Sequence, residues 1–120
     1  MERPIVLRAP GSLELGESHP DIYDRPITLR QLHLGETGAE HYLVRYPVGL
    51  QARRHRHTAA QTIVVVEGRL AVDGEILGPG GYCHFPGGVP MHHAPAAGES
   101  CLFVTIFDGP FDVFPVDGPG

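Results

Sequence analysis

The chain has 120 residues, which is enough for one domain with a single hydrophobic core. Its 16 glycines and 12 prolines exclude a helical bundle, and its 42% of apolar residues excludes a disordered chain. A formal net charge of −5 provides no basic field for nucleic acid, and no apolar run approaches the roughly 18 residues of a membrane span. We therefore expect a domain of short strands without nucleic-acid or membrane partners. Because no signal-peptide pattern follows Met1, we expect it in the cytoplasm.

The predicted elements are short strands separated by glycine and proline. In chain order they cover residues 5–7, 27–34, 41–48, 62–66, 69–72, 75–77, 82–85 and 100–107. A change of phase within 27–34 predicts a bulge, and Asp73-Gly74 predicts a type I′ hairpin turn. The continuous β-branched run at 62–66 predicts a strand buried on both faces. Because no stretch of about ten residues has the pattern of an amphipathic helix, the strands must bury each other in a sandwich or a barrel.

A pair of histidines is the main candidate for chemistry. His55 and His57 are two residues apart, so an extended segment places both imidazoles on one face and the intervening arginine on the other. Two imidazoles on one face are half of a transition-metal site. Gln61 offers an amide oxygen four residues later. The adjacent His92 and His93 both follow a proline-rich loop, and only one of them can face inward to add a third imidazole.

Other histidines, tyrosines and cysteines have less specific patterns. His84 is a candidate catalytic base or substrate-orienting donor if its face of the 82–85 strand, shared with Tyr82, looks inward. The stripe of Tyr42, Val44 and Tyr46 is typical of core packing. We expect His33 and His41, which flank a turn, to be solvated, and we expect Cys83 and Cys101 to be two buried free thiols.

The segment Gly49-x5-His55-x-His57-x3-Gln61-x6-Gly68 resembles the first cupin motif, with Gln61 where the family usually has glutamate. Residues 80–92 resemble the second motif, although its histidine would fall at Met91 instead of His92 or His93. The resemblance implies a single-domain cupin, an all-β antiparallel barrel of jelly-roll type that holds one metal ion. It covers residues 40–107, which leaves 1–34 as N-terminal arm strands and 108–120 as a tail of the same domain, 1–120.

Shorter segments resemble particular cupins. Residues 54–58, 66–68 and 107–110 are similar to small cupins related to dihydroxyacetophenone dioxygenase and acetylacetone dioxygenase, and His93-Ala94-Pro95 is similar to the cupin half of zinc-binding anti-sigma factors. The first likeness implies an Fe(II) dioxygenase that cleaves a carbon–carbon bond of a small carbonyl-containing substrate. The alternatives are a non-catalytic zinc-binding or ligand-sensing cupin and a cupin isomerase or cyclase. The neutral donor set also suits Zn, Ni or Mn. We expect a homodimer, because two-fold dimers are the commonest oligomers.

Overall fold

The structure is a computed structural model that describes residues 5–9 and 14–116. Its strands are β1 (Gly16–Ser18), β2 (Ile27–Leu34), β3 (Glu40–Tyr46), β4 (His55–His57), β5 (Gln61–Gly68), β6 (Leu70–Val72), β7 (Glu75–Leu77), β8 (Tyr82–Phe85), β9 (His93–Pro95), β10 (Cys101–Phe107) and β11 (Val113–Pro115). In this described part of the chain, no helix has the length and apolarity needed to span a membrane.

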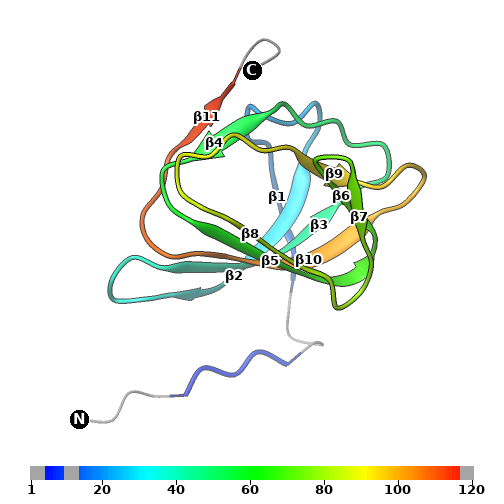
Figure 1. The fold of residues 1–120 in the computed structure, drawn as a ribbon. Coiled ribbons are helices and arrows are strands. Elements are labelled where there is room, and N and C mark those ends of the chain that lie inside the picture. Colours follow the sequence, from blue (N-terminus) through cyan, green and yellow to red (C-terminus); the bar gives the residue numbers. More distant parts are fainter. Residues whose placement is uncertain (1–4, 10–13, 117–120) are drawn as a thin grey trace.

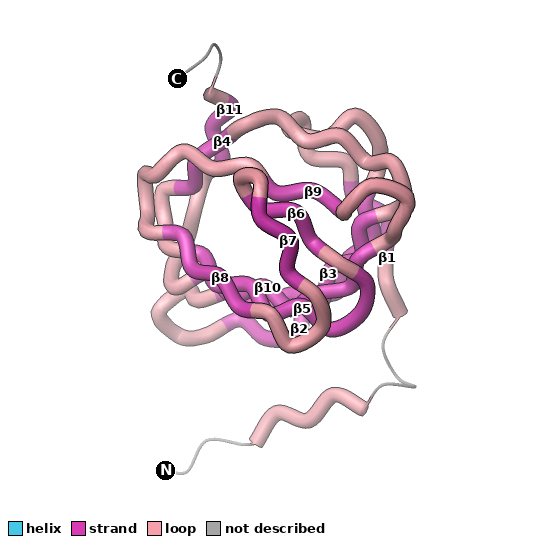
Figure 2. Tube along the Cα trace, turned by 45° about the vertical axis from the view of Figure 1, so that its right-hand side comes forward, coloured by secondary structure: helices cyan, strands magenta, loops and turns pink. Residues whose placement is uncertain are grey.

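All of the strand pairs are antiparallel, and they form three sheets. One sheet has six strands in the order β1-β2-β3-β10-β5-β8, and two small sheets have the orders β11-β4 and β7-β6-β9. Figures 1 and 2 show that the small sheets lie across from the six-stranded sheet, so the strands enclose one interior. The predicted all-β barrel is confirmed.

Two local predictions are confirmed by the backbone. Asp73 has φ 44° and Gly74 has φ 90°, the left-handed conformations that a type I′ turn between β6 and β7 requires. The register between β2 and β3 shifts between Gln31 and His33, where the change of phase predicted a bulge. Both features arise from local chemistry, which explains why a short stretch of sequence was enough to predict them.

Three strand predictions need correction. The expected strand at 5–7 is irregular: residues 5–9 lie beside β2, where Arg8 donates to the Leu32 carbonyl oxygen, and Ile5 is 84% exposed. The β5 run is buried on one face only: Ile63 is buried, whereas Val64 and Val66 are 37% and 44% exposed. These outward side chains are exposed to solvent, so β-branched residues there reflect their fit to a pleated strand. The structure also has strands outside the predicted ranges: β1, β4, β9 and, in the tail, β11, which pairs with β4.

The barrel interior is packed by large apolar side chains, including Leu50, Ile63, Met91 and Phe103. Met91 also fixes the position of β4, because its backbone N–H donates to the His55 carbonyl and its carbonyl accepts from the His55 N–H, at 2.7 and 2.9 Å. β11 pairs with the other edge of β4. The three-residue strand that carries two histidines is therefore held on both sides.

Candidate metal centre

His55 and His57 lie together inside the barrel. They are 0% and 4% exposed, whereas Arg56 between them is exposed, as the alternation of an extended strand predicts. Their ring centroids are 4.9 Å apart. The prediction that both imidazoles share the inner face of one strand is confirmed.

His93 supplies the third imidazole of the cluster. It is 1% exposed, and its ring centroid lies 5.1 Å from that of His55. His92 is turned away, because its Nε2 lies 3.0 Å from the Ala52 carbonyl oxygen. β9 begins at His93, and its pairing with β6 sets which of the two neighbours faces inward. Of the two alternatives that the sequence left open, the structure brings His93 into the cluster.

Gln61 faces the same interior from the first position of β5. It is 3% exposed, and its amide nitrogen donates a hydrogen bond of 2.9 Å to the Thr105 hydroxyl on β10. This bond directs the nitrogen toward Thr105 and leaves the amide oxygen without a partner. Gln61 therefore presents the one atom of its side chain that can act as a neutral metal ligand.

Four buried atoms of the cluster have no hydrogen-bond partner: His55 Nε2, His57 Nδ1, His93 Nε2 and Gln61 Oε1. In the described residues the only other buried side-chain atom of this kind is Arg54 Nε, outside the cluster. His55 Nδ1 lies 2.8 Å from the Arg53 carbonyl oxygen, so Nδ1 carries the hydrogen and Nε2 presents a lone pair. Because buried polar atoms are normally paired, four lone ones in one cluster indicate a missing partner.

The donor atoms suit a divalent transition metal. Burial lowers the pKa of His57 to about 4, and it also lowers the pKa of His55 and His93. All three imidazoles are therefore neutral near pH 7, the state that binds metal ions. Over residues 5–9 and 14–116, no three His, Cys, Asp or Glu side chains already stand at metal-ligand geometry. The fit lies in the chemistry and burial of the unpartnered atoms.

A cavity of about 290 Å³ opens beside the cluster. His57, Gln61 and His93 line one part of it, and most of the remaining wall is apolar or aromatic: Ile22, Ile27, Val44, Phe103, Phe107 and Phe111. The rings of Phe107 and Phe111 stack with centroids 3.7 Å apart and contact His57 edge-on. This volume and lining are typical of a small-molecule site.

Comparisons with known proteins agree with this geometry. The family model described as the ChrR cupin-like domain matches residues 22–112. This chain belongs to the ChrR cupin-like family. No curated protein matches it significantly.

Solved structures show the same cupin fold. A cupin-like protein from Thermotoga maritima is 22% identical, with 86% of this chain and 87% of that one covered and a TM-score of 0.73. An acetylacetone dioxygenase from Acinetobacter johnsonii is 18% identical, with 100% and 82% covered and a TM-score of 0.76. The structure of Rhodobacter sphaeroides SigE in complex with the anti-sigma ChrR matches with 15% identity, 84% and 52% covered and a TM-score of 0.67.

One predicted site residue of this cupin-like domain lies outside the site. His84 is exposed on the outer face of β8, where its Nδ1 lies 2.9 Å from the Thr62 hydroxyl. The inner face of β8 is occupied by Cys83, which packs against the core, and by Phe85, which is buried. The condition for a catalytic role of His84, an inward-facing ring, is not met.

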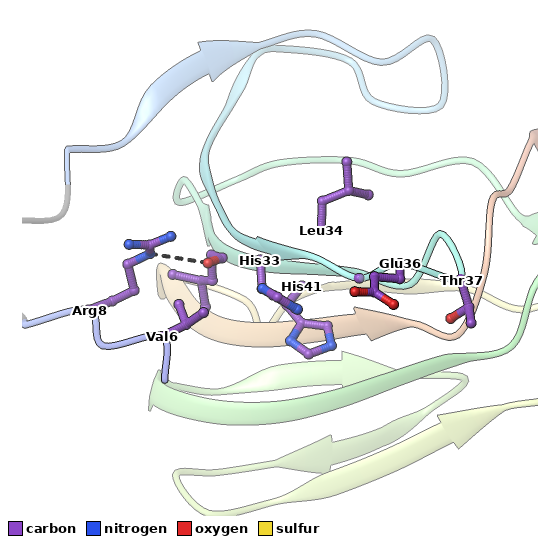
Figure 3. A pocket seen from close by; sticks show the side chains of 9 residues that line it. Val6, Arg8, His33, Leu34, Glu36, Thr37 and His41 are labelled. Atoms are coloured by element: carbon purple, nitrogen blue, oxygen red, sulfur yellow. Dashed lines mark hydrogen bonds between the residues drawn. The ribbon is translucent and has the colours of Figure 1, made fainter. Parts of the chain in front are cut away.

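His33 and His41 form a separate pair on the surface of the cupin-like domain. They face each other across β2 and β3 with ring centroids 5.3 Å apart, half-buried instead of fully solvated as expected. They line a hollow of about 860 Å³ between the N-terminal arm and the turn after β2, where Arg8 donates to the Leu32 carbonyl oxygen (Figure 3). This hollow shares no lining residue with the cavity beside the metal-site candidates.

The sequence reading missed two tyrosines at the site. Tyr46 was interpreted as core packing, but its hydroxyl lies 2.9 Å from His93 Nδ1, and the two rings stack with an interplanar angle of 7°. The Tyr46 hydroxyl also contacts the hydroxyl of Tyr23, which comes from the segment before β2. Burial raises the pKa of Tyr23 to about 12 and raises the pKa of Tyr46 well above its usual value, so both are neutral phenols. For Tyr46 the available signal was a phenol at an inward position of β3, whereas Tyr23 lies in an irregular segment that carries no such signal.

Proposed function

We propose that this cupin-like domain is a metal-dependent dioxygenase of a small carbonyl-containing molecule, with His55, His57 and His93 as its metal ligands. The observation that carries the proposal is the set of four buried nitrogen and oxygen atoms without hydrogen-bond partners beside an apolar cavity. The likeness of fold to the Acinetobacter johnsonii acetylacetone dioxygenase supports the reaction class. Gln61 is proposed as a fourth ligand or as a hydrogen-bond partner of a bound molecule.

The ligand set favours Fe(II), and Zn, Ni or Mn also suit it. When bound, Fe(II) supplies a Lewis-acid centre and one-electron chemistry with dioxygen. The protein supplies neutral donors, so the positive charge of the ion is not cancelled and an anionic oxygen of a bound molecule is favoured. Three of the four candidate ligands have a second contact that orients the side chain. These contacts are the Arg53 carbonyl for His55, the Tyr46 hydroxyl for His93 and the Thr105 hydroxyl for Gln61.

Aromatic side chains form much of the cavity wall around the candidate ligands. The stacked pair of Phe107 and Phe111 covers the His57 ring, and Phe103 packs edge-on against Tyr46 behind His93. A dry, apolar wall strengthens electrostatic interactions inside the site and protects reactive species from hydrolysis. These residues bind the apolar part of a substrate and leave its oxygen atoms to the polar side of the cavity.

The proposal is tested by the metal content and the oxygen consumption of the protein. Protein purified without added metal is analysed for bound elements, reconstituted anaerobically with Fe(II), and mixed with a panel of β-diketones and hydroxyketones in an oxygen electrode. Substrate-dependent oxygen uptake that is lost in His57→Ala supports the proposal. Iron-loaded protein that consumes no oxygen with any member of the panel counts against it.

A second candidate function is a non-catalytic zinc-binding or ligand-sensing cupin. The family match to the ChrR cupin-like domain favours it, and ChrR itself is an anti-sigma factor whose structure was solved in complex with SigE. This chain corresponds to about half of that matched chain. For a sensor we expect tightly held zinc and no oxygen uptake, whereas a cupin isomerase or cyclase would keep its activity after exhaustive chelation.

The assembly and the location of the protein stay predictions. The homodimer expected on general grounds is checked by light scattering of the purified chain. The cytoplasmic location is checked by fractionation of cells that express the chain.

A further inference from the structure

The His93 imidazole continues a chain of hydrogen bonds that ends at the cavity. Its Nδ1 lies 2.9 Å from the hydroxyl oxygen of Tyr46, a side chain that is 1% exposed. The Tyr46 hydroxyl lies 2.5 Å from the Tyr23 hydroxyl, and either oxygen can be the donor. Tyr23, Tyr46 and His93 all line the cavity. The chain therefore connects a candidate metal ligand to the space that a small molecule would occupy.

The hydrogen at His93 sets the direction of the whole chain. A neutral imidazole has one N–H and one lone pair, and each phenol has a single hydrogen to donate. If Nε2 gives its lone pair to a metal ion, Nδ1 keeps the hydrogen and donates it to Tyr46. Tyr46 then donates its own hydrogen to Tyr23. The hydrogen of the Tyr23 hydroxyl is then left over for another acceptor, and Tyr23 lines the cavity.

Without an ion, the same three groups can run in the opposite direction. His93 then carries its hydrogen on Nε2, Tyr46 donates to Nδ1, and Tyr23 donates to Tyr46. In that arrangement the Tyr23 hydrogen is already used and cannot reach a bound molecule. Metal binding therefore changes Tyr23 from a donor within the chain to a donor toward the cavity.

We infer that Tyr23 is the hydrogen-bond donor that orients the substrate, and that it binds a carbonyl oxygen on an otherwise apolar molecule. The inference rests on the proposed function, because the direction of the chain follows from His93 holding a metal ion. Tyr46 is a positioning residue, since it acts through His93 and Tyr23. A cavity of about 290 Å³ with mainly apolar walls and one available phenol donor fits a small ketone.

The test compares acetophenone with ethylbenzene, which has nearly the same shape without the oxygen. Dissociation constants are measured by NMR titration on the zinc-loaded full chain, because zinc has no redox chemistry and the probes are not consumed. The variants are Tyr23→Phe and, as a matched control on the outer face of β8, Tyr82→Phe; Tyr82 is 62% exposed. Melting curves show that each variant folds.

We expect Tyr23→Phe to reduce the preference for acetophenone over ethylbenzene by about fivefold, the effect of one neutral hydrogen bond, and Tyr82→Phe to leave it unchanged. A preference that stays at the wild-type value in Tyr23→Phe overturns the inference, because the metal ion or another group then binds the carbonyl. A chain that takes up no zinc overturns the proposed function itself, so the two failures are distinguishable. Long-range 1H–15N spectra give a second readout: zinc-loaded wild type must show His93 with its hydrogen on Nδ1.

Discussion

Replacement of His57 by leucine should stabilise the metal-free protein. His57 is 4% exposed, its Nδ1 has no partner, and its ring lies among Phe107 and Phe111. An unsatisfied buried polar atom costs about 1–3 kcal/mol, and leucine removes that atom while it keeps the apolar contacts. At about 4 °C per kcal/mol for a domain of this size, the melting temperature of the metal-free variant should rise by roughly 4–12 °C.

The same substitution should remove the response to metal. In the wild type, an ion at about 100 times its dissociation constant stabilises the folded state by about 2.7 kcal/mol, or roughly 10 °C. Thermal melts of the wild type, His57→Leu and the outer-face control His84→Leu, each with and without Zn²⁺, measure both effects. His84→Leu should keep the wild-type shift. A metal-free His57→Leu protein that melts below the wild type, or one that keeps the full metal-induced shift, would refute the reasoning.

Three further predictions concern other parts of the chain. Thr105→Val removes the hydrogen bond that orients Gln61, and zinc affinity in a competition with a chelator should fall by about tenfold. Gly68→Ala should lower the free energy of unfolding, measured in urea, by more than about 3 kcal/mol, because φ is +73° and the added Cβ would lie 2.0 Å from a backbone oxygen. Gly74→Ala, where φ is +90° but no atom lies close to the added Cβ, should lower it by only about 1–2 kcal/mol. Burial raises the pKa of the Cys101 thiol from 9.0 to about 11. The thiol therefore loses its proton at a lower pH in the unfolded chain than in the folded one, and the stability that the buried thiol contributes falls as the pH rises from 9 to 11. Iodoacetamide at pH 8 should therefore modify Cys101 slowly in folded protein and quickly in urea.

Local patterns in the sequence were enough for the histidine pair and for most of the strands. The alternation at His55, Arg56 and His57 needs only an extended backbone, and the Asp73-Gly74 turn needs only its own two residues. The choice between His92 and His93 could not be made in this way. It depends on the register of β9 against β6, a contact between segments that lie far apart in the chain.

The hydrogen-bonded chain of His93, Tyr46 and Tyr23 and the position of His84 also depend on tertiary packing. Tyr23 lies in an irregular segment with no strand period, and it meets Tyr46 only because this segment folds over the barrel. On β8, both faces carry one aromatic residue, so the pattern did not show that Phe85 would occupy the interior and leave His84 outside. The inner face of such a strand is the one that contacts apolar side chains of other segments, and a single sequence does not show those contacts.

The most direct test of the account is the metal stoichiometry of the purified chain measured by elemental analysis, beside a variant in which His55, His57 and His93 are all replaced by alanine. We predict about one divalent transition-metal ion per wild-type chain, reloaded after chelation, and none in the folded triple variant. Wild-type protein that stays metal-free after incubation with Fe(II), Zn²⁺, Ni²⁺ and Mn²⁺ in turn would contradict the account, as would a folded triple variant that still holds one ion per chain.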